Sequence, residues 1–197
     1  MQTRSLETRE KILSTCYQLF LQQGYDTTGV AQICETAQIS KGAFYHHFPS
    51  KRDVFMTLLE DWLHRVDAQF EKIQQETSST PQQLKLMSAE LNSVFSEADQ
   101  LPMFLEIWIQ SMRDPSISKK TIAPYYKYLG FFEEVFKNGI ADGSITKTSD
   151  AHLSSRLMVA FALGMILQCM IEPHGEDWQK MSSYGLETIL SGLKENK

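Results

Sequence analysis

The stretch TTGVAQICETAQISKGAFYHHFPSK, residues 27–51, decides the fold of the first part of this chain. Its pattern predicts two short helices that are separated by a tight polar turn. The side-chain oxygen of Thr28 is suited to cap the first helix, which we expect to end at about Thr36. The apolar residues on its inner face are Val30, Ile33 and Cys34 or Ala37. Two short helices joined by a turn are typical of a DNA-reading domain.

The second helix begins after Ser40, a favourable N-cap, and is expected to span residues 41–48. Pro49 ends it, because proline disfavours helical geometry in the residue before it. Phe44 and Phe48 are four residues apart on one side, so they can hold this short helix against its neighbours. The side chains left on the outer side are Lys41, Ala43, Tyr45, His46 and His47. A helix of this size fits the DNA major groove, and its N-terminal amides suit a phosphate.

Several motifs in this region occur in an order that is characteristic of one family. They are TREKIL at 8–13, LF at 19–20, GYDTT at 24–28, IC at 33–34 and ISKGAFYHHFPSK at 39–51. Together they resemble the N-terminal domain, or head, of the TetR family of bacterial transcription regulators. The resemblance implies an all-helical homodimer in which the second short helix enters the major groove. It also implies a larger C-terminal domain, or body, that binds a small molecule.

The same resemblance implies which residues contact DNA. Thr28 would touch a phosphate from the start of the first short helix, and Lys51 would bind a phosphate from the next helix. Ala43 and His46 stand at positions that vary within the family and would select the bases. The complete predicted set is Thr28, Ser40, Lys41, Gly42, Ala43, Tyr45, His46, His47 and Lys51.

Three residues of the head depart from the family's pattern. Cys16 and Cys34 stand where alanine is most common, and a small thiol can pack in its place. Gly29 stands where a residue of better helix propensity is usual. We expect it to cost the first short helix up to about 1 kcal/mol relative to alanine.

The composition of the 197 residues is that of a globular protein, with 42% hydrophobic and 22% charged residues. The longest apolar run, residues 157–171, is shorter than the roughly 18 residues of a membrane span and is interrupted by Gly164 and Gln168. The first residues are polar and lack the pattern of a secretory signal. We therefore expect a cytoplasmic protein with no membrane partner.

Charge is distributed unevenly along the chain. Residues 1–52 contain six Lys or Arg against four Asp or Glu, a balance of +2, so the total of −5 leaves −7 for the rest. An acidic protein can still bind DNA if its cations share one face. Because each copy has few cations, a dimer is the natural way to gain enough phosphate contacts.

Candidate catalytic and metal-ligating residues form no recognisable motif. Cys16, Cys34 and Cys169 are odd in number and widely separated, so they predict neither a disulfide framework nor a metal site. The five histidines lack the spacing of common zinc motifs, and the glycines are too dispersed for a phosphate-binding loop. We expect no enzymatic activity, no catalytic residue, no metal and no cofactor.

The rest of the chain predicts further helices and no strand, so the expected fold class is all-α. Gly24 is suited to end a first helix over residues 5–22. The sequence SKRD at 50–53 is a capping box that opens a long helix to about Gln75. The later helices are expected at residues 82–95, 102–112, 118–140, 150–171 and 176–193.

Two domains follow from this reading. Residues 1–52 form the DNA-binding domain, with its helix-turn-helix at about 28–48, and residues 53–197 form a helical domain for effector binding and dimerisation. The long helix joins the two and is expected to transmit any change between them. Pro124 is expected to kink its helix or to mark a start near Ala123.

The last two helices have more apolar surface than a small domain can bury alone. A second copy of the chain would cover it, as the family resemblance also implies, whereas the alternative is an ordinary core within one chain. The predicted interface residues are Leu157, Ala160, Gly164, Leu167, Leu186, Ile189 and Leu190.

Aromatic and methionine residues of the body suggest an effector pocket, although such residues are also typical of plain core. The predicted pocket residues are Trp62, Phe104, Trp108, Met112, Tyr125, Tyr126 and Phe161. Polar partners for a ligand are Glu106, Gln110, Arg156 and Gln168.

These observations favour a ligand-responsive repressor that binds a palindromic operator as a homodimer. Its partners would be double-stranded operator DNA, a second copy of itself and a small, largely apolar or aromatic effector that releases it from DNA. The alternative is a DNA-bound protein-interaction module without a small-molecule effector.

Overall fold

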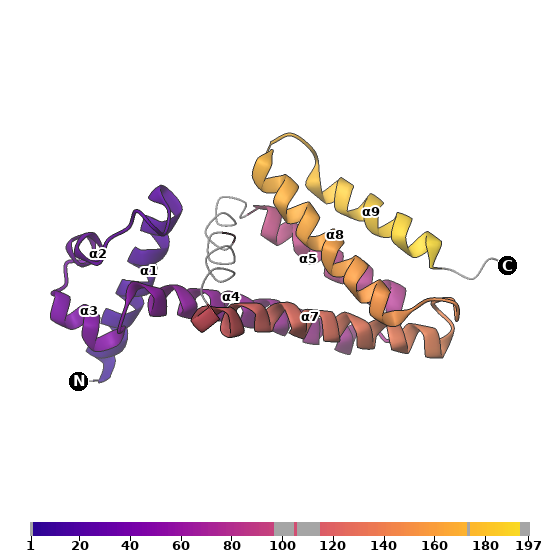
Figure 1. Ribbon diagram of the computed structural model, residues 1–197, viewed down its shortest axis with the longest axis horizontal. Helices are drawn as coiled ribbons and strands as arrows, with labels where there is room; N and C mark the ends of the chain where they lie inside the picture. The colour runs from indigo at the N-terminus through magenta and orange to yellow at the C-terminus, as the bar shows by residue number, and fades with distance from the viewer. Residues whose placement is uncertain (1, 97–104, 106–114, 173, 194–197) are drawn as a thin grey trace. The chain divides into compact units, whose positions relative to one another are not determined.

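The computed structural model describes residues 2–96, 105, 115–172 and 174–193. These residues form helices and connecting turns without a strand, so the predicted all-α fold class is confirmed (Figure 1). The helices are α1 (Gln2–Gln23), α2 (Val30–Thr36), α3 (Lys41–His47), α4 (Lys51–Glu76), α5 (Thr80–Ser96), α7 (Pro115–Asp142), α8 (Ala151–Ile171) and α9 (Trp178–Gly192). Of the helix predicted at 102–112, only residue 105 is described, and it is helical.

The chain divides into two compact units, and the division falls inside α4, between Val66 and Asp67. The predicted domain boundary lies earlier, after residue 52. The start of α4 belongs with the head because Val54 and Phe55 are fully buried there, with Phe55 in contact with aromatic rings of the head.

In the head, apolar side chains recur along one face of α1 and contribute to its core. Ile12 and Cys16 are completely buried, and Phe20 is nearly so. The ring centroid of Tyr25 lies 5.2 Å from that of Phe20 and 5.4 Å from that of Phe55. Edge-to-face pairs at these distances stabilise a core beyond the area they bury. The aromatic rings therefore connect α1, the loop after it and α4.

The end of α1 and the start of α4 have the residues that the sequence predicted for them. Gly24 follows the last residue of α1 with φ +87°, a left-handed conformation that suits glycine at a helix end. Ser50 caps α4: its Oγ accepts a hydrogen bond from the Asp53 amide over 3.3 Å and donates to the Asp53 carboxylate over 2.6 Å.

The start of α2 differs from the prediction, because Gly29 and not Thr28 is the N-cap. Thr28 is only 1% exposed; its Oγ1 donates to the Gly24 carbonyl over 2.8 Å and accepts from Gln23 Nε2 over 3.1 Å. The hydroxyl thus closes the end of α1 and is not available to cap α2. Gly29 precedes the helix, where glycine is only a few tenths of a kcal/mol worse than a good cap, so the expected cost inside the helix does not arise.

The body is formed by α5, α7, α8 and α9 together with the end of α4. Helix α8 packs against α7 and α9, and α5 packs against α7, α8 and α9 (Figure 1). The core includes Leu84 of α5, Phe136 of α7 and Leu186 of α9, each at most 2% exposed. Helix α7 runs without interruption through Pro124, so the alternative start near Ala123 is wrong.

The end of α4 is tied to α7 within the body. The Asp67 carboxylate pairs with the Lys127 ammonium and accepts a hydrogen bond from the Tyr128 hydroxyl over 3.1 Å. Burial, followed by the charge of Asp67, raises the pKa of Tyr128 above its usual value, so the hydroxyl stays protonated as the donor. Phe70 stacks on Phe131 with 5.1 Å between ring centroids. The last turns of α4 are therefore held by both polar and aromatic contacts.

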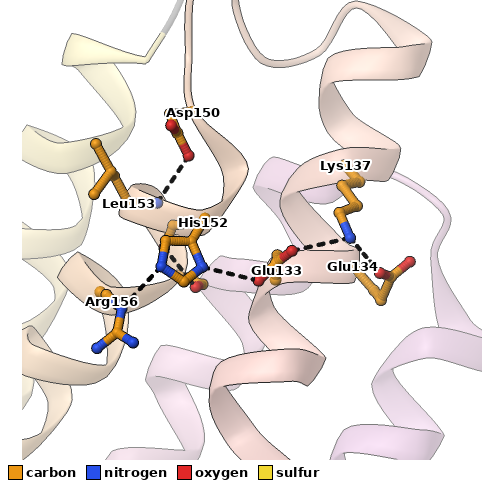
Figure 2. Close-up of polar contacts among 8 residues, drawn as sticks. Glu133, Glu134, Lys137, Asp150, His152, Leu153 and Arg156 are labelled. Atoms are coloured by element: carbon orange, nitrogen blue, oxygen red, sulfur yellow. Dashed lines mark hydrogen bonds and ion pairs between the residues drawn. The ribbon is translucent and has the colours of Figure 1, made fainter.

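A polar cluster connects α7 to α8 (Figure 2). Glu133 of α7 lies 3.0 Å from the Lys137 ammonium and 3.2 Å from His152 Nδ1 of α8, while Arg156 Nε donates to His152 Nε2 over 3.1 Å. This donation assigns the imidazole proton to Nδ1, facing the carboxylate. The hydrogen bond from Lys137, and then the one from His152, lower the pKa of Glu133. Since Lys137, His152 and Arg156 are exposed and Glu133 is only half-buried, the cluster adds little stability.

Helix α8 corrects the expectation that no segment is long enough to cross a membrane. With 21 residues it is long and apolar enough to cross one, by length and composition alone. Core helices of globular proteins pass the same test, and here Met158, Val159 and Met165 point into the body. The opposite side of α8 exposes Leu157 and other apolar residues, so both sides are apolar.

Two glycines of α7 provide a matched test of body packing. An added methyl group at Gly139 would lie 2.7 Å from Ile145 Cγ1 and 2.8 Å from Thr80 Cγ2, whereas at Gly130 it would meet nothing within 4 Å. We predict that Gly139→Ala lowers the free energy of unfolding by about 1–3 kcal/mol through overpacking. We predict that Gly130→Ala raises it by up to about 1 kcal/mol through helix propensity. Urea unfolding followed by circular dichroism, at one protein concentration, checks both; equal effects would contradict the packing described here.

Candidate nucleic-acid interface

Helix α3 is short and depends on its ends and its neighbours. It has seven residues, far fewer than an isolated helix needs in water. The Ser40 hydroxyl accepts a hydrogen bond from the Ala43 amide over 3.0 Å, which confirms the predicted N-cap. At the other end the Phe48 amide donates to the Phe44 carbonyl over 2.9 Å.

The inner side of α3 is buried as predicted. Phe44 is completely buried and Phe48 is 3% exposed, with 6.4 Å between their ring centroids. The Arg9 guanidinium of α1 lies 5.3 Å from the centroid of the Phe48 ring, a distance at which a cation is attracted to the ring face. These contacts fix α3 by one side and leave the other side free of the core.

The outer side of α3 brings together the residues that the sequence placed there. Lys41, Gly42, Tyr45 and His46 are exposed, and the Tyr45 side chain, at 53%, is one of the more exposed large side chains of the head. Ala43 and His47 are half-buried. The surface combines an ammonium, a phenol and two imidazoles, which can donate hydrogen bonds to phosphates and base edges. We call residues 40–47 the α3 surface.

The turn between α2 and α3 was not anticipated in detail. Gln38 has φ 51°, in the left-handed region that non-glycine residues seldom adopt. The Ile39 amide donates to the Cys34 carbonyl over 2.9 Å and the Gln38 amide to the Glu35 carbonyl over 3.0 Å. These two bonds form a Schellman motif, which usually has glycine at this position. The sequence gives no sign of it, because glutamine is not a typical residue there.

The two remaining predicted contacts are Thr28 and Lys51. Unlike the exposed residues of the α3 surface, both have side chains that are at least half-buried and hydrogen-bonded within the head. Thr28 is buried, with its hydroxyl engaged as described, so its side chain is not placed to reach a phosphate. Lys51 is half-buried, and its ammonium donates to the carbonyls of Tyr25 and Thr28. We therefore leave Thr28 out of the proposed contacts below and consider Lys51 separately.

The predicted pocket residues are only partly placed in the body. Phe104, Trp108 and Met112, with the polar candidates Glu106 and Gln110, lie outside the described residues. Trp62 and Tyr125 are half-buried, whereas Tyr126 is 63% exposed and so does not line an enclosed site. Phe161 packs against α9, where a methyl group added to Gly185 would approach the ring to 2.5 Å. It is a core contact between α8 and α9.

The predicted dimer residues fall into two groups. Leu157 and Leu167 are 51% and 46% exposed, Ala160 is exposed and Gly164 is half-buried. Leu186 and Leu190 are instead buried in the core of the body, which corrects their assignment to a surface; Ile189 is half-buried. They face inward because α9 directs its apolar face towards α5, so the same periodicity that suggested an interface serves the core.

The exposed apolar surface also contains residues that were not among the predicted interface residues. Leu153 and Ile171 of α8 are 62% and 70% exposed. Together with the predicted interface residues of α8, they recur every three or four positions along one side of that helix, at 153, 157, 160, 164, 167 and 171. We call this row the α8 stripe. On α9, Met181 and Tyr184 are exposed as well.

The cysteines are buried thiols in the described structure. Burial, with Cys34 as a smaller cause, raises the pKa of Cys16 to about 12. A thiol of this kind is inert compared with a reactive one. Within the described part of the chain, no three His, Cys, Asp or Glu side chains gather as a metal site would require.

Comparison with known proteins places the head in a defined family. Residues 12–57 match the family model described as bacterial regulatory proteins, tetR family. The HTH-type transcriptional repressor NemR of Escherichia coli is 43% identical over 54 residues, which cover 27% of each chain. Similarity to that relative is thus confined to a segment the size of the head.

Other relatives match along almost the whole chain. The HTH-type transcriptional regulator UidR of Escherichia coli is 24% identical over 98% of this chain and 96% of its own. QacR of Staphylococcus aureus, also an HTH-type transcriptional regulator, is 25% identical over 96% of this chain and all of its own. A TetR transcription regulator from Haloarcula marismortui has the same fold, with a TM-score of 0.83 at 17% identity over 96% of this chain and 99% of its own. Residues 12–57 thus match the tetR family of bacterial regulatory proteins, and similarity to HTH-type transcriptional regulators extends along almost the whole chain.

Proposed function

We propose that this chain is a ligand-responsive repressor that acts in the cytoplasm as a homodimer on a palindromic operator. The observation that carries the proposal is the α3 surface, where Ser40, Phe44 and Phe48 hold a two-turn helix so that Lys41, Tyr45 and His46 face outward. Full-length relatives that are transcriptional regulators support the same function.

The proposed contacts combine positioning with base reading. Lys41 and the amides at the start of α3 bind phosphates, and Tyr45 and His47 donate hydrogen bonds to the backbone or to base edges. Ala43 and His46 face the bases and select among them. With a balance of only +2 in residues 1–52, each head binds weakly alone, so two heads on two half-sites are needed.

The first experiment is selection from random duplex DNA with purified protein at a stated salt concentration. We expect recovery of an inverted repeat whose half-sites lie about one helical turn apart. Failure to enrich any sequence above the nonspecific background would contradict the proposed function.

Two neighbouring residues of α3 separate DNA contact from folding. Tyr45→Phe removes only an exposed hydroxyl, and we expect it to weaken operator binding about tenfold for each hydrogen bond lost to a phosphate, with unfolding unchanged. Phe44→Ala removes a fully buried ring and should lower the free energy of unfolding of the head by about 3 kcal/mol or more. Titration of the selected operator and thermal unfolding measure the two effects. A Tyr45→Phe variant that binds like the wild type would remove Tyr45 from the interface.

We infer that the α8 stripe is the dimer contact. Its exposed leucines and Ile171 leave a continuous apolar surface on the body, while Ala160 and Gly164 between them allow another helix to approach closely. Leu186 and Leu190 do not take part, since they fill the core of the body. The residues that carry this contact are Leu153, Leu157, Ala160, Gly164, Leu167 and Ile171.

A charge placed in the stripe tests this contact. We predict that Leu157→Glu yields a folded monomer at micromolar concentration, because a buried unpaired carboxylate would oppose association. Lys147→Glu, at an exposed position in the loop before α8, changes the net charge more but lies off the stripe and should leave the dimer intact. Sedimentation equilibrium distinguishes the two variants. A Leu157→Glu protein that remains dimeric would place the interface elsewhere.

We propose a small, largely apolar or aromatic effector for the body. Half-buried aromatic side chains such as Tyr125 support an apolar ligand. A structural neighbour, FadR of Bacillus subtilis, is described in complex with stearoyl-CoA, so this fold can hold such a ligand in that protein. Effector and operator would weaken each other's binding by the same factor. If no such compound changes operator affinity, the protein-interaction alternative is favoured.

A further inference from the structure

Lys51, the first residue of α4, reaches the loop that joins α1 to α2. Its ammonium nitrogen lies 2.5 Å from the carbonyl oxygen of Tyr25 and 2.8 Å from that of Thr28. The same nitrogen lies 4.1 Å from the centroid of the Tyr25 ring. The two carbonyls and the ring face thus surround the ammonium on the side of the loop.

This arrangement engages two of the three donor hydrogens of the lysine. An ammonium has three donor hydrogens and accepts none, and here two hydrogens point to carbonyls while the ring attracts the charge. The side chain is half-buried, so breaking these contacts would leave a partly desolvated charge without compensation. A phosphate would have to share the ammonium with these bonds or displace them.

The position of these carbonyls links Lys51 to the DNA-reading helices. Thr28 is followed by Gly29, the N-cap of α2, which has no side chain to cap the helix. Lys51 therefore holds the chain immediately before α2 to the start of α4. Helix α2 packs against α3, so the direction of α2 determines where the α3 surface points.

We propose that Lys51 is a positioning residue for DNA binding: it fixes the start of α2 through the Tyr25 and Thr28 carbonyls and does not bind a phosphate itself. This replaces the phosphate contact that the family resemblance implied for Lys51. The inference rests on the proposed function, because its consequence is a change in operator affinity.

Salt dependence separates the two roles. A lysine that binds a phosphate releases counterions, so its loss reduces the slope of log affinity against log salt by about 0.9 per contact, or about 1.8 for a dimer. A lysine that only positions α2 leaves this slope unchanged while the affinity falls. Lys41, exposed on α3, is the matched phosphate-binding control.

The experiment compares the wild type, Lys51→Met and Lys41→Met on the selected operator between about 50 and 200 mM salt. It is run at a temperature where circular dichroism shows each variant folded. We expect Lys51→Met to bind about tenfold or more weakly with the wild-type slope, and Lys41→Met to bind more weakly with a reduced slope. A reduced slope for Lys51→Met, or unchanged affinity, would overturn the proposal.

A measurement on the wild-type protein covers the case in which Lys51→Met does not fold. Amine labelling with an N-hydroxysuccinimide ester, read by mass spectrometry, compares Lys51 with Lys41 in the free protein and on the operator. We expect Lys41 to react readily and to be protected by DNA, and Lys51 to react slowly in both states. Rapid labelling of free Lys51 that DNA prevents would establish a phosphate contact instead. If the wild-type protein had no preferred operator, the proposed function would be contradicted. That outcome can be distinguished from both labelling results for Lys51.

Discussion

The head depends on the burial of Phe44 and Phe48. Helix α3 has seven residues and cannot persist alone, so its stability comes from these two rings, which are 0% and 3% exposed. Both rings lie on one side, and the Ser40 cap fixes the first turn. The polar side chains are therefore on the opposite side because the aromatic ones must be buried. The same packing that makes the helix stable creates the surface that we propose to read DNA.

Helix α4 has fixed contacts at both ends, although each set belongs to a different unit. Near its start, Lys51 holds the loop before α2, and Phe55 joins the aromatic core of the head. Near its end, Asp67 and Phe70 bind side chains of α7. An effector in the body that shifts α7 would therefore act directly on the end of α4. We propose that coupling between effector and operator passes through these contacts.

Helix caps, which depend on residues close in sequence, could be predicted. Contacts that depend on how distant helices pack against one another could not. Ser40, Gly24 and the Ser50–Asp53 capping box were identified because each acts within one turn. Thr28 was assigned to the wrong helix, because its hydroxyl can close α1 as well as open α2. The periodicity of Leu186 and Leu190 fits either an interface or a core. They are in the core because α5 packs against α9. The carbonyl contacts of Lys51 span more than twenty residues, so no local pattern could reveal them.

The central claim is that two copies of the α3 surface, held at a fixed separation, read the two halves of one site. The direct measurement is the affinity for the selected operator when the spacing of its half-sites is changed by half a helical turn and by a full turn. We predict a loss of affinity of at least about tenfold for the half turn, since one head then faces away from its half-site. Equal affinity at every spacing would show that each head binds independently and would contradict it.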